Sequence, residues 1–125
     1  MSILVNSVVV FEDATSVFVS RMLAADGDPA VQADVSSISY AVYDRKLGTE
    51  VISDTLTVSS VVYDTLQTGS IWTRDDVGYN FKYALPTTAF PTGGRSYRVE
   101  FKWTFADGTV GIDAYDCRAE AIYIS

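Results

Sequence analysis

The stretch Tyr97–Phe105 constrains the fold of this 125-residue chain more than any other. Five large apolar side chains alternate there with charged or polar ones, which is the period-two pattern of a strand with one buried face. Asp107-Gly108 follows, and this pair favours a tight hairpin because glycine readily adopts the positive φ that the turn needs. The run from 110 to 124 is therefore predicted to fold back antiparallel. Burying five such side chains, at about 1.5–3 kcal/mol each, rivals the ~5–15 kcal/mol net stability of a domain, so this hairpin belongs to the core.

Shorter alternating runs predict further strands at 15–23, 35–44, 50–58, 61–66 and 79–85. Apolar residues on both faces of the run 15–23 suggest a strand that is covered on both sides. In the run 79–85, Asn80 alternates with large apolar residues. Two prolines and two glycines make 86–94 a long crossover, in which Phe90 is expected to plug one end of the fold. No window keeps a helical period beyond about three turns.

This order of elements predicts an all-β protein. Seven or eight strands, joined by hairpins and one long crossover, fit an immunoglobulin-like antiparallel β-sandwich better than a closed barrel. The length suits one domain, which we place at 12–125. Residues 1–11 form an apolar segment that is either a first strand or an arm lying on a neighbouring subunit.

This N-terminal segment supplies the first candidate partner-binding residues, which are Ile3, Leu4, Val5, Val8 and Val10. An apolar segment of this kind can lie on a partner or add a strand to it. It lacks the basic start and the cleavage site of a signal peptide, so we do not expect export. No stretch approaches the ~20 apolar residues of a membrane span. We expect synthesis in a cytoplasm and no membrane partner.

The charge and the residue types restrict the chemistry. A net charge of −7 disfavours direct binding to nucleic acid or to an anionic membrane, because phosphate contacts depend on lysine and arginine. The chain has no histidine, which removes the Ser-His and Cys-His nucleophiles and the histidine-containing metal triads. Cys117 is the only cysteine, so it forms no internal disulfide and is expected to be a buried thiol. We predict no enzymatic activity and no cofactor.

Two loops need a separate interpretation. Asp26-Gly27-Asp28, with Asp34 nearby, could suggest calcium, but the twelve-residue loop with its terminal Glu is missing, and we expect a plain turn and no metal. Trp72, Arg74 and Asp75 lie in a polar loop that could meet a receptor or a glycan if the indole is exposed. A hydrolase would instead need two carboxyl groups about 5–9.5 Å apart in one cleft.

The order of motifs resembles the immunoglobulin-like domains of tailed-phage structural proteins, including baseplate proteins of the upper type and related tail and head accessory modules. The resemblance spans 12–125. Its first half is carried by the acidic start Glu12-Asp13, the turn Asp26-Gly27-Asp28-Pro29 and the strand Ile38–Asp44, and its second half by Tyr79–Tyr83, the Pro/Gly crossover, Tyr97–Trp103 and Asp107-Gly108.

The resemblance implies a virion protein that is made in the host cytoplasm. No coiled-coil or receptor-binding region follows the sandwich, which favours a capsid decoration (cement) protein that bridges and stabilises neighbouring coat subunits. A tail, neck or baseplate accessory protein and a receptor- or glycan-binding module are the alternatives. The expected partners are coat or tail subunits and further copies of the chain in a homo-oligomer. Trp72, Arg74 and Asp75 join the N-terminal residues as candidate contacts.

Overall fold

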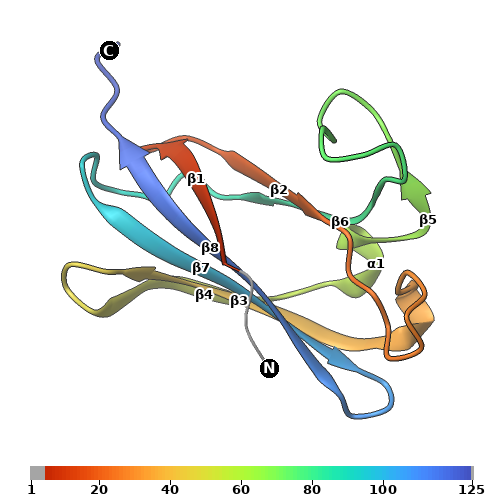
Figure 1. Ribbon diagram of the computed structural model, residues 1–125. Coiled ribbons are helices and arrows are strands. Elements are labelled where there is room, and N and C mark those ends of the chain that lie inside the picture. The colour runs from red at the N-terminus through yellow and green to blue at the C-terminus, as the bar shows by residue number, and fades with distance from the viewer. Residues whose placement is uncertain (1–4, 125) are drawn as a thin grey trace.

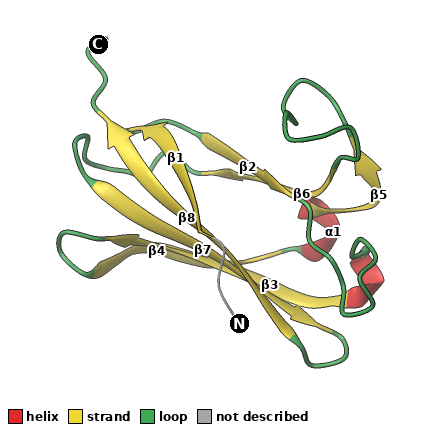
Figure 2. Ribbon diagram, in the orientation of Figure 1, coloured by secondary structure: helices red, strands yellow, loops and turns green. Residues whose placement is uncertain are grey.

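The computed structural model describes residues 5–124 and places eight strands in two facing sheets (Figures 1 and 2). The larger sheet has the order β1-β8-β7-β3-β4 and the smaller one the order β2-β6-β5. The strands are β1 (Val5–Phe11), β2 (Ser16–Ser20), β3 (Val35–Asp44), β4 (Thr49–Leu56), β5 (Val62–Gln67), β6 (Tyr79–Leu85), β7 (Ser96–Phe105) and β8 (Val110–Glu120). The prediction of an all-β sandwich is confirmed.

Several strands have the bounds that the alternation predicts, namely β3 and β6 in full and β7 to within one residue. The hairpin at Asp107-Gly108 is also confirmed, with Gly108 at φ +90°. Strand β8 ends at Glu120, earlier than predicted. Two short helical turns were not predicted: a 3₁₀ turn (Gln32–Asp34) before β3 and the four-residue α1 (Val58–Val61) after β4. Within residues 5–124, no helix has the length and apolarity needed to cross a bilayer.

The core lies between the two sheets and is built from the inward residues of β7, as predicted. Trp103 and Phe101 are fully buried and contact Phe81 of β6 with ring centroids 5.3 and 5.0 Å apart. Phe90 of the crossover is also fully buried and packs edge-on against Tyr97 at 5.4 Å. The crossover therefore closes part of the core, as its apolar residue suggested.

Three features differ from the sequence-based expectation. Strand β1 pairs with β8 in parallel, with Phe11 opposite Glu120, so the sandwich is not purely antiparallel. Strand β2 is not covered on both sides: Phe18 is buried, but Val17 is 44% exposed because no third layer packs on the outer face of the small sheet. Asn80 is buried instead of lying on an exposed polar face, because its side-chain amide bonds to the backbone of Met22 and Ala30.

The N-terminal segment joins the fold as far as the structure describes it. Residues 5–11, for which the sequence left an arm or a strand open, form β1 at the edge of the larger sheet. Ile3 and Leu4 lie outside the described residues. Strand β2 is an edge of the smaller sheet, so both sheets present a free edge on the same side of the molecule (Figure 1).

Candidate functional site: a groove between two free strand edges

A groove of about 410 Å³ lies between β1 and β2. Since each of these strands is the last in its sheet, the groove runs along two backbone edges that have no strand partner within residues 5–124. The loop between β5 and β6 (68–78) closes the groove at one end. Apart from one arginine, the described residues that line it are apolar or neutral.

The wall formed by β1 has one buried and one exposed row of side chains. Val10 is buried and Val8 packs against the core, so these two residues hold the strand in place. Val9 is 59% exposed and Phe11 is exposed to a similar extent. Strand β1 therefore offers apolar surface to a partner along an edge that can also form main-chain hydrogen bonds.

The opposite wall is formed by β2 and is anchored by an aromatic cluster. Phe18 is buried and meets Tyr115 of β8 edge-on, with ring centroids 4.8 Å apart. Val17 points away from this cluster and is exposed. Ile71 adds a further exposed apolar side chain from the loop. The groove thus combines a buried aromatic floor with exposed apolar rims.

Trp72 belongs to the end wall and is only 8% exposed. Its indole Nε1 donates a hydrogen bond to Asp75 Oδ1 at 2.8 Å, and Asp75 also accepts hydrogen bonds from the backbone N–H groups of Val77 and Gly78. Arg21 of the 21–31 segment pairs with the same carboxylate at 3.0 Å. The hydrogen bond from Trp72, followed by those from the loop backbone and Arg21, lowers the pKa of Asp75 to about 2 although partial burial opposes the shift. Asp75 therefore fixes the shape of the loop.

Arg74 supplies the only charge among the described residues that line the groove. Its guanidinium carbon lies 6.0 Å from the centre of the Trp72 ring, a cation–π distance. The other five arginines each form an ion pair with an acid, whereas Arg74 forms none within residues 5–124. The groove of this acidic protein therefore has a basic end.

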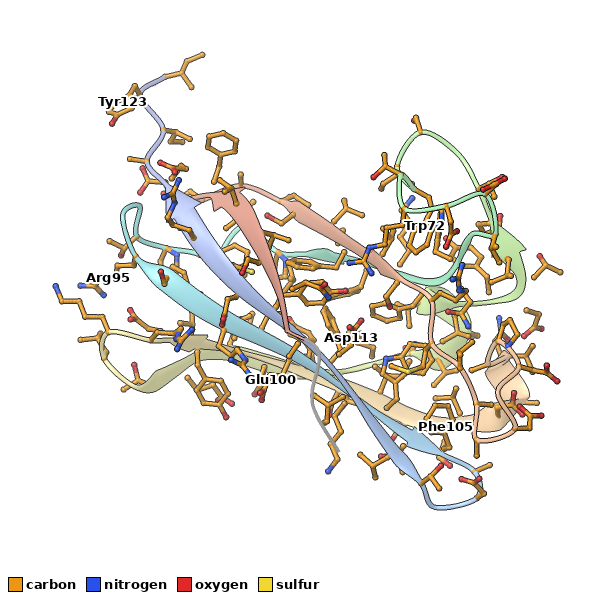
Figure 3. The ribbon with its side chains drawn as sticks, viewed as in Figure 1. Trp72, Arg95, Glu100, Phe105, Asp113 and Tyr123 are labelled. Carbon is orange, nitrogen blue, oxygen red and sulfur yellow. The ribbon has the colours of Figure 1, made fainter. Side chains whose placement is uncertain are left out.

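One carboxyl group lies close to the groove floor. Tyr115 donates a hydrogen bond from its hydroxyl group to Asp113 Oδ2 at 3.0 Å. Burial raises the pKa of Asp113, and Arg74 and Tyr115 counteract part of that shift. The neighbouring carboxylate raises the pKa of Tyr115 further, in addition to burial. Figure 3 shows Asp113 in the interior between the two sheets.

Four of the eight predicted contact residues meet in this groove. These are Val8, Val10, Trp72 and Arg74, although no pattern in the sequence connects the N-terminal segment with the loop. Asp75 supports Trp72 through the hydrogen bond to its indole and does not line the groove. The other N-terminal candidate with described backbone is Val5 of β1, which pairs with Ala114 of β8.

The residues of β2 that complete the groove were missed. Val17 was interpreted as part of a strand covered on both faces, whereas it forms an exposed rim. A signal was present in the sequence, because apolar residues on both faces of a strand fit an edge that meets a partner as well as a buried strand.

The other sites considered from the sequence have structural explanations. Asp26 accepts a hydrogen bond from the Asp28 backbone N–H at 3.0 Å, and Gly27 has φ +88°, which describes a turn. Within residues 5–124, no three acidic or cysteine side chains gather closely enough to hold a metal ion. Cys117 is fully buried in β8, and burial raises the pKa of its thiol to about 12.

Comparisons with known proteins give little further guidance. No protein-family model matches the chain, and no curated protein sequence matches it. Among solved structures, CopC from Methylosinus trichosporium OB3b is similar with a TM-score of 0.49 and 12% sequence identity, over 97% of this chain and 89% of that chain. We therefore infer the function from the residues of this chain.

Proposed function

We propose that this protein is a non-enzymatic structural protein of a tailed-phage virion, a capsid decoration protein that binds neighbouring subunits through the groove between β1 and β2. The observation that carries the proposal is that groove, which two free strand edges flank and whose rims carry exposed apolar side chains. The order of motifs, which resembles phage immunoglobulin-like domains, supplies the virion context.

The groove suits binding by β-strand addition. An extended segment placed along β1 or β2 would gain main-chain hydrogen bonds, and its alternate side chains would contact the exposed rims. Val9, Phe11 and Val17 are each about half exposed, so covering them contributes roughly 1 kcal/mol each by the transfer scale for apolar side chains. A modest gain per copy becomes large when many copies bind one particle, and no bond needs to be made or broken.

The environment of Trp72 argues against the alternative of a glycan- or receptor-binding loop. An indole that stacks on a ligand has to present its face, but Trp72 is nearly buried and its N–H group is already bonded to Asp75. Placement on a tail, neck or baseplate instead of the capsid would use the same groove. The binding surface is therefore the same whether the protein sits on the capsid or on the tail.

A pair of valine substitutions tests this proposal. Val17→Glu places a charge on the rim of the groove, whereas Val110→Glu makes the same change at a similarly exposed strand position outside it. We expect Val17→Glu to weaken retention on particles purified from the source of this protein by at least tenfold, measured by co-sedimentation, and Val110→Glu to leave retention unchanged.

Equal retention of the two variants would contradict the proposal. Deleting the N-terminal segment would be a poorer test, because β1 pairs with β8 along its whole length. Such a deletion would expose the edge of β8 and destabilise the large sheet, so loss of binding would not identify a contact surface. Point substitutions at exposed positions avoid this problem.

A further inference from the structure

Arg74 is the one cation among the described residues that line the groove between β1 and β2. Its guanidinium carbon lies 6.0 Å from the centre of the Trp72 ring, and that of Arg21 lies 5.9 Å from the same ring. Arg21 pairs with Asp75 at 3.0 Å, whereas Arg74 forms no ion pair within residues 5–124. The contact with the indole therefore orients a guanidinium that is exposed and has no acidic partner.

Asp113 is close enough to sense this charge but does not neutralise it at the surface of the groove. Burial raises the pKa of the Asp113 carboxyl group, hydrogen bonding lowers it, and the charge of Arg74 contributes the smallest lowering. Asp113 has a donor of its own, the Tyr115 hydroxyl group at 3.0 Å, and it does not line the groove. A carboxylate that arrives from outside therefore finds Arg74 available.

The two ends of the groove carry opposite charge. Strand β2 leads at its last residue to Arg21, which an ion pair ties to the loop that carries Arg74. The other end of β2 follows the turn 12–15, which begins with Glu12 and Asp13. Figure 1 shows this turn and the loop at opposite ends of β2. A carboxylate bound in the groove is therefore attracted at the loop end and repelled at the turn end.

The length of β2 sets the length of chain that the groove can hold. The five residues Ser16–Ser20 span roughly 16 Å at about 3.3 Å per residue, so an extended segment of about five residues fits beside them. Alternate side chains of such a segment would face the floor, where Phe18 and Tyr115 are buried, and the others would face the rims at Val9 and Val17. Apolar residues suit these positions.

We propose that the groove binds an extended apolar segment of a partner protein that carries an aspartate or a glutamate at one end, and that Arg74 pairs with this carboxylate. The inference rests on the proposed function and deepens it by stating the chemistry of the bound segment. Because Arg74 lies at the loop end, the position of the acid fixes the direction in which the segment lies. The apolar rims supply contact area, and Arg74 determines which apolar segments are accepted.

A charged pair at this position acts on specificity more than on affinity. A guanidinium presents paired N–H donors that match the two oxygens of a carboxylate. Arg74 is exposed, however, and an exposed ion pair strengthens binding by only about two- to fivefold. A partner that places a lysine or an arginine beside Arg74 is rejected by repulsion, which widens the difference between correct and incorrect segments.

A fatty acid would use the same guanidinium and the same apolar floor. The free backbone edges of β1 and β2 favour a peptide instead, because their unpaired N–H and C=O groups can bond to another main chain and gain nothing from a hydrocarbon chain. The peptide is therefore the occupant that uses both the edges and the charge of the groove.

A selection from random peptides tests the inference on the folded full chain. The immobilised chain is used to enrich a displayed library of random nine-residue peptides. Peptides enriched on the unchanged chain should contain a run of apolar residues that ends in aspartate or glutamate. On Arg74→Glu, lysine or arginine should replace this acid, and on Arg74→Lys the acid should remain. Val17→Glu should enrich few peptides, because it places a charge on the apolar rim.

Synthetic peptides then measure the pair itself by isothermal titration calorimetry. The most enriched peptide is compared with a copy in which an amide replaces the acid. Loss of the peptide carboxylate or Arg74→Gln should each weaken binding by two- to fivefold, and Arg74→Glu should weaken it at least fivefold. The peptide change and Arg74→Gln together should weaken binding no more than either alone, because both remove the same pair.

Lys46→Glu is the matched control. Lys46 is exposed in the turn between β3 and β4, does not line the groove and forms no ion pair within the described residues. This variant should enrich the same peptides as the unchanged chain, and circular dichroism should show native β structure in all variants. If Arg74→Glu does not fold, Arg74→Gln replaces it in the selection and should lose the preference for an acid.

Three results of the selection would overturn the inference. The first is enrichment of apolar peptides that lack an acid, and the second is enrichment of the same acidic peptides on Arg74→Glu. The third is a failure to enrich any peptide, including the case in which dodecanoate binds the groove through Arg74 and the occupant is a lipid.

Retention on particles separates this inference from the proposed function. If Val17→Glu is lost from particles but the selected peptides show no preference for an acid, the groove still binds the virion and the inference is wrong. If the preference for an acid depends on Arg74 but Val17→Glu stays on particles, the chemistry of the segment is correct and the proposed binding surface on the virion is wrong.

Discussion

Replacing Asn80 with alanine tests how a buried amide holds the 21–31 segment against the smaller sheet. The side chain is almost completely buried in β6. Its Oδ1 accepts a hydrogen bond from the Met22 backbone N–H at 2.8 Å, and its Nδ2 donates to the carbonyl oxygens of Met22 and Ala30 at 2.9 Å each. Three hydrogen bonds thus depend on one side chain.

The loss in the free energy of unfolding depends on which backbone groups lose their hydrogen-bond partner. Without the amide, the Met22 N–H group and the Ala30 carbonyl group are left unpaired, whereas the Met22 carbonyl group still accepts from the Ala30 N–H group. An unpaired buried polar group costs about 1–3 kcal/mol, so Asn80→Ala should lower the free energy of unfolding by about 2–5 kcal/mol. For a domain of this size, that corresponds to a fall in melting temperature of roughly 10 °C or more.

Urea unfolding followed by tryptophan fluorescence measures this change. Asn6 of β1 is the only other asparagine and makes no side-chain hydrogen bond in the described structure, so Asn6→Ala serves as the matched control and should change stability by less than about 0.5 kcal/mol. If Asn80→Ala costs less than about 1 kcal/mol, the reasoning from unpaired groups is refuted.

Replacing Asn80 with aspartate tests the direction in which the loss of stability changes with pH. Asn80→Asp keeps the size of the side chain but places a carboxylate beside two carbonyl oxygens. Burial there should raise the pKa of the new carboxyl group above its unfolded value. The variant should therefore be least stable relative to the unchanged chain at neutral pH, and the difference should shrink as the pH falls and the carboxyl group becomes protonated.

Three further predictions concern other parts of the structure. Because the pKa of Asp75 falls from 3.8 unfolded to about 2 folded, its contribution to stability is present above pH 4 and is lost as the pH falls toward 2. Asp75→Asn should lack this component in acid titrations monitored by tryptophan fluorescence, and an unchanged titration would show that the bond to Trp72 is unimportant. Cys117, buried and with a pKa of about 12, should resist iodoacetamide at pH 8 until urea unfolds the chain, and rapid native labelling would contradict its burial. Gly93→Ala should lower the melting temperature and displace the C-terminal segment, because the new Cβ would lie 2.6 Å from Ala121 Cα, and an unchanged melting temperature would mean that the crossover can shift.

The sequence predicted those strands in which one face is buried in the core along the whole strand. In β7, every second side chain faces the same core, so the alternation in the sequence and the burial in the structure coincide. Asn80 is buried although the alternation predicts an exposed polar residue, because its hydrogen-bond partners are backbone groups of 21–31, a segment distant in sequence. The parallel pairing of β1 with β8 could not be read from pattern, since partners so far apart in the chain leave no local trace.

The candidate site, like the fold, could be predicted from the sequence only in part. The apolar character of β1 and the mixed composition of the loop at Trp72 were both visible in the sequence, and each pointed to a contact surface. Their meeting at one groove depends on which strands end each sheet, a property of the topology. The run after Asp107-Gly108 was predicted to fold back as a strand as far as 124, but β8 ends at Glu120, where it loses its neighbours.

The parallel pairing of β1 with β8 also affects how the chain is made. A ribosome adds about 5–20 residues per second, so β1 emerges roughly 5–20 s before the strand that it pairs with. Throughout that interval the nascent chain presents its most valine-rich strand without a partner. Where several ribosomes translate one message, the first strand of one chain can meet the last strand of a neighbouring chain whose own β1 is still unpaired. Assembly by exchanging β1 between chains is therefore available during synthesis, before any finished molecule has closed its larger sheet.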